Sequence, residues 1–221
     1  MIQAVIFDID GTLIDSVDLH AQAWQDAFDD YGFQFDLAAI RSQIGKGGDQ
    51  LLPVFLADAE REAKGKQIEA HRSALFKERY LSRIKPFADV PSLMQAIRSA
   101  GVRTALASSA KQEELETFQK IAGINGLIDV AASSDDAERS KPHPDIFAAT
   151  LEKLGGPDPA AVLAIGDSPY DAQAAGKLGI RTIGVLCGGF AEADLREAGC
   201  IAIYRDPAAL LQDLHGWLTP G

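Results

Sequence analysis

Two carboxylates stand two positions apart near the start of the chain. Asp8 and Asp10 belong to DIDGTLIDS (8–16), which directly follows the apolar run QAVIF (3–7). Side chains alternate along a strand, so residues at this spacing can point to the same side, and Gly11 permits a sharp turn of the backbone. Two close carboxylates repel each other unless a divalent cation or a shared proton separates their states. One of them can then act as a nucleophile while the other acts as an acid and a base.

Two further polar segments follow later apolar runs. ALASSA (105–110) contains Ser108 and Ser109, which, with the neighbouring amides, could donate hydrogen bonds to phosphate oxygens. Serines after strands are also ordinary turn residues. In RSKPHPDIF (139–147), Lys141 precedes a loop punctuated by prolines, so its ammonium could be a fixed point charge or simply a solvated group.

A fourth polar segment, IGDSPYD (165–171), also follows an apolar run. Asp167 is placed to bind a hard cation at the carboxyl end of the predicted strand. Asp171, four positions later, falls in the first turn of a predicted helix. An acidic residue there also stabilises the helix N-terminus by about 0.3–1 kcal/mol, so a capping role is the alternative to metal binding.

The elements that must position these residues are short apolar strands separated by helical patterns. Helices such as SLMQAIRSAG (92–101) separate most of the apolar runs. Strand and helix alternating at this spacing predict right-handed crossovers and a parallel sheet covered on both faces. The predicted strands are residues 3–7, 102–107, 127–132, 161–166, 180–185 and 200–204.

The alternation breaks between the first strand and the second. Residues 16–84 contain no convincing strand and show apolar positions at helical spacing, which predicts three or four helices. This segment is too long for a crossover. The sequence therefore predicts an α/β catalytic core, residues 1–15 and 85–221, with a helical cap inserted over 16–84. GTLID (11–15) and KPFADVP (85–91) would be the two hinges.

Composition limits the possible partners. Of 221 residues, 32 are acidic and 21 are basic, which gives a net charge of −11. This charge should repel nucleic acid and anionic membranes, because both are bound through clustered Lys and Arg. We therefore expect neither as a partner. An anionic substrate would need local positive charge or a bound cation at its site.

Two features predict a cytoplasmic protein. No apolar stretch reaches the roughly 18 residues of a membrane span, and the N-terminus lacks the pattern of a signal peptide. Cys187 and Cys200 have no Cys or His companions at metal-binding spacing, which is typical of small buried residues in a reducing compartment.

The order of the polar segments, an Asp pair, then Ser, Lys and Asp, resembles the haloacid dehalogenase superfamily. Its four motifs match DIDGTLIDS, ALASS, KPHPD and GDSPYD, with a cap inserted after the first. Within the superfamily the chain is similar to the phosphoglycolate phosphatase and β-phosphoglucomutase branch, and HAQAW (20–24) is similar to the cap helix of the mutase. The resemblance implies a Rossmann-like core with an all-helical cap.

The resemblance also implies roles for individual residues. Asp8 would attack phosphorus to give an aspartyl phosphate, and Asp10 would protonate the departing alcohol and then activate water. Asp8, the Asp10 carbonyl and Asp167 would bind Mg²⁺, with Asp171 as a further candidate. Ser108, Ser109 and Lys141 would hold the transferring phosphoryl group. Phosphoryl transfer requires mainly positioning and charge stabilisation, which this set can supply.

The branch leaves three functions open. A phosphatase of small phosphorylated metabolites is favoured, because mutases of this branch tend to carry Glu-Asp where this chain has Gly166-Asp167. Dehalogenases lack an acid at the position of Asp10 and use no magnesium. A sugar-phosphate mutase and a noncatalytic binding protein remain alternatives. The sequence identifies neither the substrate nor the oligomeric state.

Two residues of the predicted cap are candidates for substrate contact. His20 lies one helical turn from Trp24 and could face the site, although a lone helical His is more often a surface or packing residue. Lys46 lies in the glycine-rich stretch IGKGG (44–48), whose flexible backbone would let its ammonium approach a substrate. Such stretches are also common as simple connections.

Overall fold

A six-stranded parallel sheet forms the centre of the molecule in the computed structural model, which describes residues 1–218. The strand order is β5-β4-β1-β6-β7-β8, and every neighbouring pair is parallel. The strands are β1 (Ala4–Phe7), β4 (Arg103–Ala107), β5 (Val130–Ala132), β6 (Val162–Gly166), β7 (Arg181–Val185) and β8 (Cys200–Tyr204). All six strands predicted from the sequence are present.

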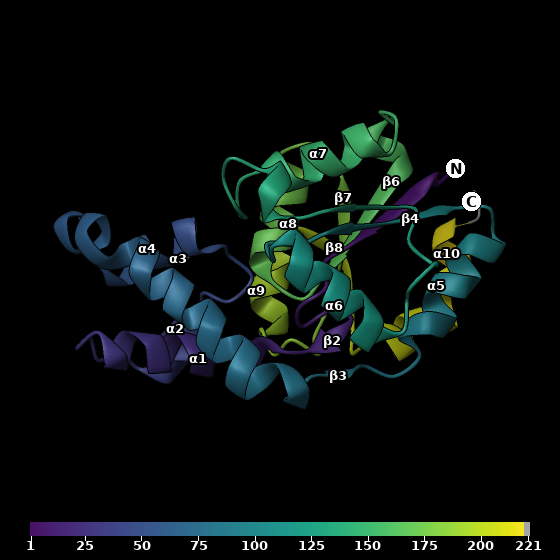
Figure 1. Cartoon of the computed structure of the whole chain (residues 1–221). Helices are drawn as coiled ribbons and strands as arrows, with labels where there is room; N and C mark the ends of the chain where they lie inside the picture. Colours follow the sequence, from purple (N-terminus) through teal and green to yellow (C-terminus); the bar gives the residue numbers. More distant parts are fainter. Residues whose placement is uncertain (219–221) are drawn as a thin grey trace.

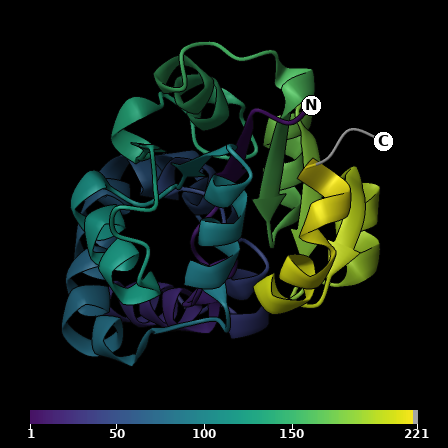
Figure 2. The same ribbon diagram turned by 90° about the vertical axis from the view of Figure 1, so that its right-hand side faces the viewer.

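Helices cover both faces of this sheet (Figures 1 and 2). They are α5 (Val90–Ser99), α6 (Gln112–Ala122), α7 (Asp145–Lys153), α8 (Pro169–Gly176), α9 (Glu192–Glu197) and α10 (Pro207–Leu218), with short 3₁₀ turns at Ser134–Asp136 and Pro159–Ala161. Side chains of β1 alternate between two apolar clusters. Val5 and Phe7 pack with α5, α6 and α10, whereas Ala4 and Ile6 pack with α7 and α8. Burial on both faces explains why β1 is apolar throughout.

A helical insertion separates β1 from α5 in the sequence. It contains α1 (Val17–Asp30), α2 (Leu37–Arg41), α3 (Gly48–Phe55), α4 (Asp58–Leu75), a π-helical turn (Phe76–Tyr80) and a 3₁₀ turn (Leu81–Arg83). These helices gather to one side of the sheet (Figure 1). Trp24, Phe28, Leu51 and Ile68 belong to a buried cluster separate from the two that flank the sheet. The predicted all-helical cap is therefore present as a packed unit.

The two connections to the insertion pair with each other, which the sequence did not predict. β2 (Ile14–Asp15) and β3 (Lys85–Pro86) form a two-stranded antiparallel sheet, with Ile14 opposite Pro86. Both strands are only two residues long, so no alternation of side chains can reveal them. The short sheet ties together the two segments that the sequence indicated as hinges.

Strand β5 is shorter than predicted. The sequence indicated residues 127–132, but the strand begins at Val130. The backbone oxygen of Leu127 accepts hydrogen bonds from the side chains of Arg98 and Thr104, and the Asp129 carboxylate accepts one from the Thr104 amide. Hydrogen bonds with side chains thus occupy the Leu127 carbonyl and the Thr104 amide, two backbone groups that a longer strand could use to pair with its neighbour.

Candidate active site

The sheet register brings three of the four polar segments to one edge. Phe7 pairs with Leu106 on one side and with Ile165 on the other. The residues that follow these strands therefore start from the same edge of the sheet, at its carboxyl end. This edge is where ligand sites form in open parallel sheets.

Lys141 is buried at the centre of this edge. Its ammonium donates to Oδ1 of Asp8 at 2.6 Å and to the backbone oxygen of Ala107 at 2.7 Å. It also lies 2.8 Å from Oδ1 of Asp171. Lys141 is fully buried, so the alternative that it is a solvated loop residue is wrong. Its ion pairs with two buried carboxylates explain how a lysine is accommodated there.

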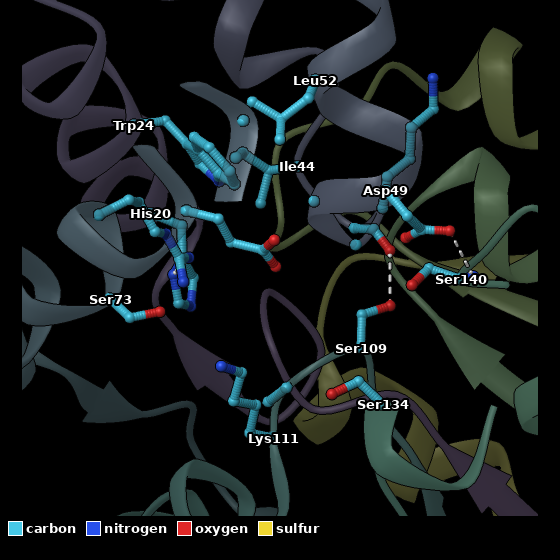
Figure 3. Close-up of a pocket in the computed structure, with 18 of the residues that line it drawn as sticks. His20, Trp24, Ile44, Asp49, Leu52, Ser73, Ser109, Lys111, Ser134 and Ser140 are labelled. Atoms are coloured by element: carbon cyan, nitrogen blue, oxygen red, sulfur yellow. Dashed lines mark hydrogen bonds between the residues drawn. The ribbon is translucent and has the colours of Figure 1, made fainter. Parts of the chain in front are cut away.

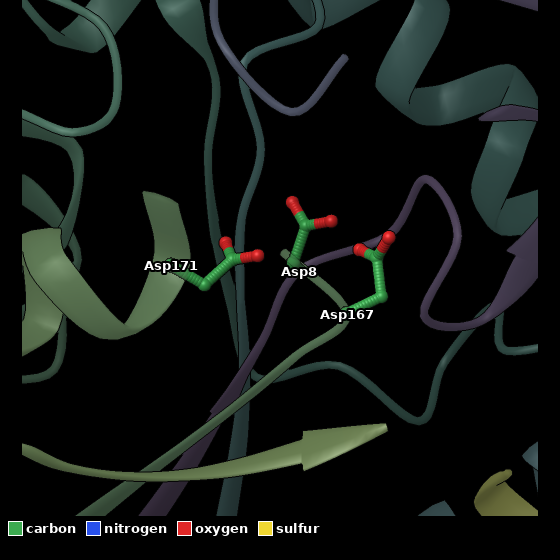
Figure 4. A group of neighbouring side chains, drawn as sticks. All are labelled: Asp8, Asp167 and Asp171. Carbon is green, nitrogen blue, oxygen red and sulfur yellow. The ribbon is translucent and has the colours of Figure 1, made fainter. Parts of the chain in front are cut away.

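Three buried carboxylates surround one space at this edge, those of Asp8, Asp167 and Asp171 (Figure 4). One oxygen of each lies within 4.8 Å of the others. Asp167 follows β6 and accepts a hydrogen bond from Thr12 at 3.2 Å. Asp171 also accepts bonds from the amide and the hydroxyl of Ser168, at 3.1 and 2.6 Å. Asp171 thus both caps α8 and joins the cluster.

Negative charge exceeds positive charge in this cluster. Burial raises the pKa of Asp8 to about 7; Lys141 opposes this rise, and Asp171 adds to it. Burial, Asp171 and Asp8 likewise raise the pKa of Asp167 well above its ordinary value. A single ammonium therefore does not neutralise the three carboxylates. Carboxylate oxygens are the donors that Mg²⁺ prefers, so both the donor set and the uncompensated charge fit this ion.

Gly11 allows Asp167 to reach the cluster. Its φ angle is +77°, and a Cβ atom at this position would lie 2.4 Å from Oδ2 of Asp167. A larger residue would be strained and would also displace the carboxylate. The first motif thus requires glycine at this position both for the backbone turn and for the close approach of Asp167.

The Asp10 carboxylate contacts the start of α1 and is not one of the three clustered carboxylates. Its Oδ1 accepts hydrogen bonds from the Ser16 hydroxyl at 2.6 Å and from Nε2 of His20 at 2.8 Å. Its side chain is absent from the group of three clustered carboxylates, so the metal contact expected of Asp10 can apply only to its backbone carbonyl. The carboxylate is instead held by the insertion, through α1.

The tautomer of His20 follows from its second partner. A guanidinium nitrogen of Arg72 contacts Nδ1 of His20. Because a guanidinium can only donate, Nδ1 must accept, and the ring proton lies on Nε2, which donates to Asp10. His20 is buried and stacks on Phe76 with 4.0 Å between ring centroids. Burial alone would raise the pKa of Asp10, but contacts with His20 and Ser16 and the charge of Arg72 hold it below its ordinary value.

A cavity of about 790 Å³ lies between the insertion and the sheet edge, with Asp8 and Asp10 in its wall. Figure 3 shows Trp24 and Leu52 of the insertion on one side of it and Ser109 and Lys111 of the core on another. The cavity is large enough for a phosphate ester with a leaving group of several carbons.

The other predicted site residues occupy different positions around this cavity. Ser109 lines it and donates to the backbone oxygen of Gly45 at 3.2 Å. Ser108 is fully buried outside the lining, and its hydroxyl accepts from the Ala110 amide. Lys46 lines the cavity, but its ammonium donates to Gln43 and lies 4.6 Å from the centre of the Tyr170 ring.

The insertion is fastened over the sheet edge by several contacts. The Ser140 amide donates to Asp49 at 3.1 Å, and the Tyr170 hydroxyl donates to the backbone oxygen of Ser42 at 2.6 Å. A Cβ atom on Gly47 would lie 2.0 Å from Oγ of Ser140, so this close approach requires glycine. These contacts place the insertion across the entrance to the carboxylate cluster.

Sequence reasoning missed Arg72, Glu114 and Asp49, all of which line the cavity. Arg72 lies on α4, four residues before the buried apolar residue Phe76. Periodicity therefore identifies the inward face of α4, but it does not reveal that the charged end of Arg72 meets His20, 52 residues away in sequence.

Comparisons with known proteins agree with the motifs. A family model described as "Haloacid dehalogenase-like hydrolase" matches residues 5–185, which is most of the chain. The chain belongs to this hydrolase family. This membership confirms the resemblance seen in the four motifs.

Two similar proteins are named as phosphatases. A phosphoglycolate phosphatase of Aquifex aeolicus is 29% identical over 84% of this chain and 85% of its own length. A phosphorylated carbohydrates phosphatase of Thermotoga maritima is 28% identical over 92% and 94%.

Solved structures agree with the fold of this family. A hydrolase from Pseudomonas syringae has a TM-score of 0.85 and 28% identity and covers 98% of this chain and 99% of its own. A β-phosphoglucomutase from Clostridium difficile, at 21% identity, shares the fold with a TM-score of 0.79 and covers 99% of this chain and 97% of its own. Within residues 1–218, no helix combines the length and the apolar character needed to cross a bilayer.

Proposed function

We propose that this member of the haloacid dehalogenase-like family is a Mg²⁺-dependent phosphatase of small phosphomonoesters. The observation that carries the proposal is the position of Asp8, at the wall of the cavity, within 2.6 Å of Lys141 and beside the Asp167 and Asp171 carboxylates. The phosphatase names of the Aquifex aeolicus and Thermotoga maritima relatives support the same activity class.

In the proposed reaction Asp8 is the nucleophile. A bond forms between an Asp8 oxygen and phosphorus as the bond from phosphorus to the departing oxygen breaks. The approaching phosphate raises the proton affinity of Asp10, because like charges disfavour the ionised carboxylate, so that Asp10 takes up a proton from solvent as the substrate binds. Oδ2 of Asp10, the oxygen not held by His20 and Ser16, then gives this proton to the departing oxygen. Water then attacks phosphorus, Asp10 takes its proton, and Asp8 is released with inorganic phosphate.

Asp8 and Asp167 would hold Mg²⁺, with Asp171 and the Asp10 backbone carbonyl as further candidates. When bound, the ion would offset the charges of the carboxylate and of the phosphate. Lys141 and the serines after β4 would neutralise and orient the phosphoryl oxygens. Because Ser108 lies outside the cavity lining, Ser109 is the better placed of the two hydroxyls.

We also propose the division into a core, residues 1–15 and 85–221, and a cap, residues 16–84. The separate apolar cluster of the insertion and the pairing of β2 with β3 support these boundaries. Residues 219–221 lie outside the described part of the chain. A cytoplasmic location, and the absence of nucleic-acid and membrane partners, stay predictions from the sequence.

A phosphate-release screen tests the function. In a panel of phosphate esters of glycolate, polyols, sugars, nucleosides and amino alcohols, purified protein should release inorganic phosphate from at least one ester with Mg²⁺ and from none with excess EDTA. A sugar-phosphate mutase would retain its phosphoenzyme and require a bisphosphate activator, and a binding protein would turn over nothing. If none of the esters releases phosphate, the proposal is contradicted.

The carboxylate cluster predicts unequal effects on the Mg²⁺ requirement. Asp167→Ala should raise the Mg²⁺ concentration for half-maximal activity by more than 100-fold. Asp171→Ala should raise it by about 10–100-fold, as is usual for residues that support a ligand, because Asp171 is already occupied by Ser168 and Lys141. Activity and calorimetric Mg²⁺ titrations measure both, with exposed Asp213→Ala as the matched control. A larger effect from Asp171 would exchange the two roles.

The contact between His20 and Asp10 predicts a loss of turnover when it is removed. His20→Phe can keep the stacking on Phe76 but takes the donor from Oδ1 of Asp10. We expect kcat to fall roughly 10- to 100-fold, because a misplaced acid loses alignment with the departing oxygen. The loss should be greatest for poor leaving groups. His71→Phe, which removes the cap pair with Asp30, is the control. Equal kcat values for both variants would remove His20 from this role.

A further inference from the structure

Two charged side chains that line the cavity have buried atoms without a hydrogen-bond partner among residues 1–218. These atoms are Nε of Arg72 and Oε1 of Glu114. The Glu114 side chain belongs to a residue that is only 8% exposed. Buried polar atoms are nearly always paired, so two orphans of opposite sign in one cavity indicate groups that a ligand satisfies.

Both side chains lie beside the contact between Asp10 and His20. Arg72 meets His20 through Nη2, which leaves Nε free for another acceptor. Glu114 lies one helical turn before Phe118 on α6, and Phe118 packs edge-on against His20 with 6.1 Å between ring centroids. Residues four apart lie on the same helix face. The two orphans are therefore on the side of the cavity where Asp10 would protonate the departing oxygen.

The charges of Arg72 and Glu114 attract each other, yet no Arg72 ion pair within 4.0 Å forms in the part of the chain that the structure describes. The space between a free donor and a free acceptor suits an uncharged group that both donates and accepts hydrogen bonds. A hydroxyl can donate to Oε1 of Glu114 while it accepts from Nε of Arg72. A carboxylate would be repelled by Glu114, and an ammonium would be repelled by Arg72.

On the basis of the proposed phosphatase function, we propose that Arg72 and Glu114 bind a hydroxyl of the departing alcohol and so select hydroxylated phosphomonoesters over carboxylated or amino ones. The rest of the lining agrees with this class. Asp49 and Glu69 accompany Lys46 and Lys66 around the cavity, so it lacks the surplus of cations that a second anionic group would need. The volume of about 790 Å³ accommodates a polyol or a sugar.

Four phosphate esters of similar size test this selection in the wild-type protein. Glycerol 3-phosphate carries hydroxyls, propyl phosphate carries none, phosphoglycolate carries a carboxylate and phosphoethanolamine an ammonium. We expect kcat/KM for glycerol 3-phosphate to exceed that for propyl phosphate by about 10- to 100-fold. Propyl phosphate has no hydroxyl, so Nε of Arg72 and Oε1 of Glu114 would stay without hydrogen-bond partners in its transition state. The two charged esters should fall below propyl phosphate. A preference for either charged ester would overturn the assignment.

Variants of Glu114 separate recognition from packing. Glu114→Met removes the acceptor, so the ratio of kcat/KM for glycerol 3-phosphate to that for propyl phosphate should fall to near one. Glu114→Gln keeps an acceptor oxygen without the charge, so it should retain most of this ratio and admit phosphoglycolate at least about 10-fold better. Glu116→Met, exposed on the same helix, should leave every ratio as in the wild type.

The outcomes distinguish this assignment from the phosphatase proposal. If no ester releases phosphate, the phosphatase proposal fails. If propyl phosphate is hydrolysed but Glu114→Met and Glu114→Gln leave the substrate ratios unchanged, the hydroxyl assignment fails and the function stands. A Glu114 variant with a lower melting temperature and unchanged ratios would make the charge pair structural. If Glu114→Met does not fold, the wild-type ranking and Glu114→Gln decide.

Discussion

Asp8→Asn should release no measurable phosphate from any ester while the protein stays folded. The amide keeps the shape of the side chain and can still accept from Lys141 through its oxygen, but it lacks the charge needed to attack phosphorus. We expect kcat to fall by about 10⁴–10⁶, the range for removal of a nucleophile. The melting temperature in EDTA should not fall, because the substitution removes one charge from an over-acidic cluster.

The covalent intermediate gives this prediction a second measurement. Acid quenching of the wild-type protein with a labelled substrate should trap phosphate on the protein, and Asp8→Asn should trap none. Asp29→Asn, at an exposed position of α1, is the control for the chemistry of the substitution. Turnover close to the wild-type value, or label retained by Asp8→Asn, would assign the nucleophile to another residue.

The meeting of three of the four motifs was predictable because it follows from the sheet. The motifs of Asp8, Ser108 and Asp167 come directly after apolar runs, and parallel strands in register bring their carboxyl ends to one edge. The prediction therefore needed only strand positions, which short β-branched runs indicate well. The same reasoning explains why Asp8 and Asp167 come together although 159 residues separate them in sequence.

Contacts made by the insertion were not predictable in the same way. Helical periodicity shows which residues of α4 face inward, but the contact of Arg72 with His20 depends on how α4 packs on α1 within the insertion. The neighbours of Glu114, which lies on α6 of the core, depend on how the insertion packs on the core. His20 was weighed as a packing or a site residue; the structure shows that it stacks on Phe76 and contacts Asp10, and its role in the reaction is part of the proposed function.

The burial of Lys141 could not be predicted from its local sequence. A lysine before a proline is ordinarily solvated, and no periodicity marks this one as buried. Its burial becomes favourable only when Asp8 and Asp171, from two other segments, supply opposite charges. The site thus depends on a residue whose environment is assembled entirely by tertiary contacts.

Lys141→Met should destabilise the fold as well as abolish most turnover. Methionine is of similar length but leaves the Asp8 and Asp171 carboxylates without their cation and the Ala107 carbonyl without its donor. Removing one partner of a buried ion pair costs about 3–5 kcal/mol in the free energy of unfolding. Turnover should fall about 10²–10³, the usual effect of losing one group that stabilises developing charge.

Lys153→Met is a matched control for this substitution. Lys153 also donates to a backbone oxygen, that of Ala131 at 2.9 Å, and pairs with Asp136 at 2.8 Å, but its side chain is 37% exposed. Because solvent screens this pair, its loss should cost less than about 1 kcal/mol. Chemical denaturation in EDTA measures both variants. Equal losses from Lys141→Met and Lys153→Met would show that the buried cluster gains nothing from its ammonium.

The pH dependence of the Lys141→Met loss separates charge from packing. Burial raises the pKa of Asp8 from 3.8 to about 7, although the positive charge of Lys141 opposes this rise. Without Lys141 the pKa of Asp8 should rise further. A carboxyl with a raised folded pKa binds more protons in the folded state, so stability falls as pH rises above the unfolded value. The destabilisation in EDTA should therefore be larger at pH 8 than at pH 5, and adding Asp8→Asn should recover part of it at pH 8. A loss independent of pH and unaffected by Asp8→Asn would mean that Lys141 acts through packing alone.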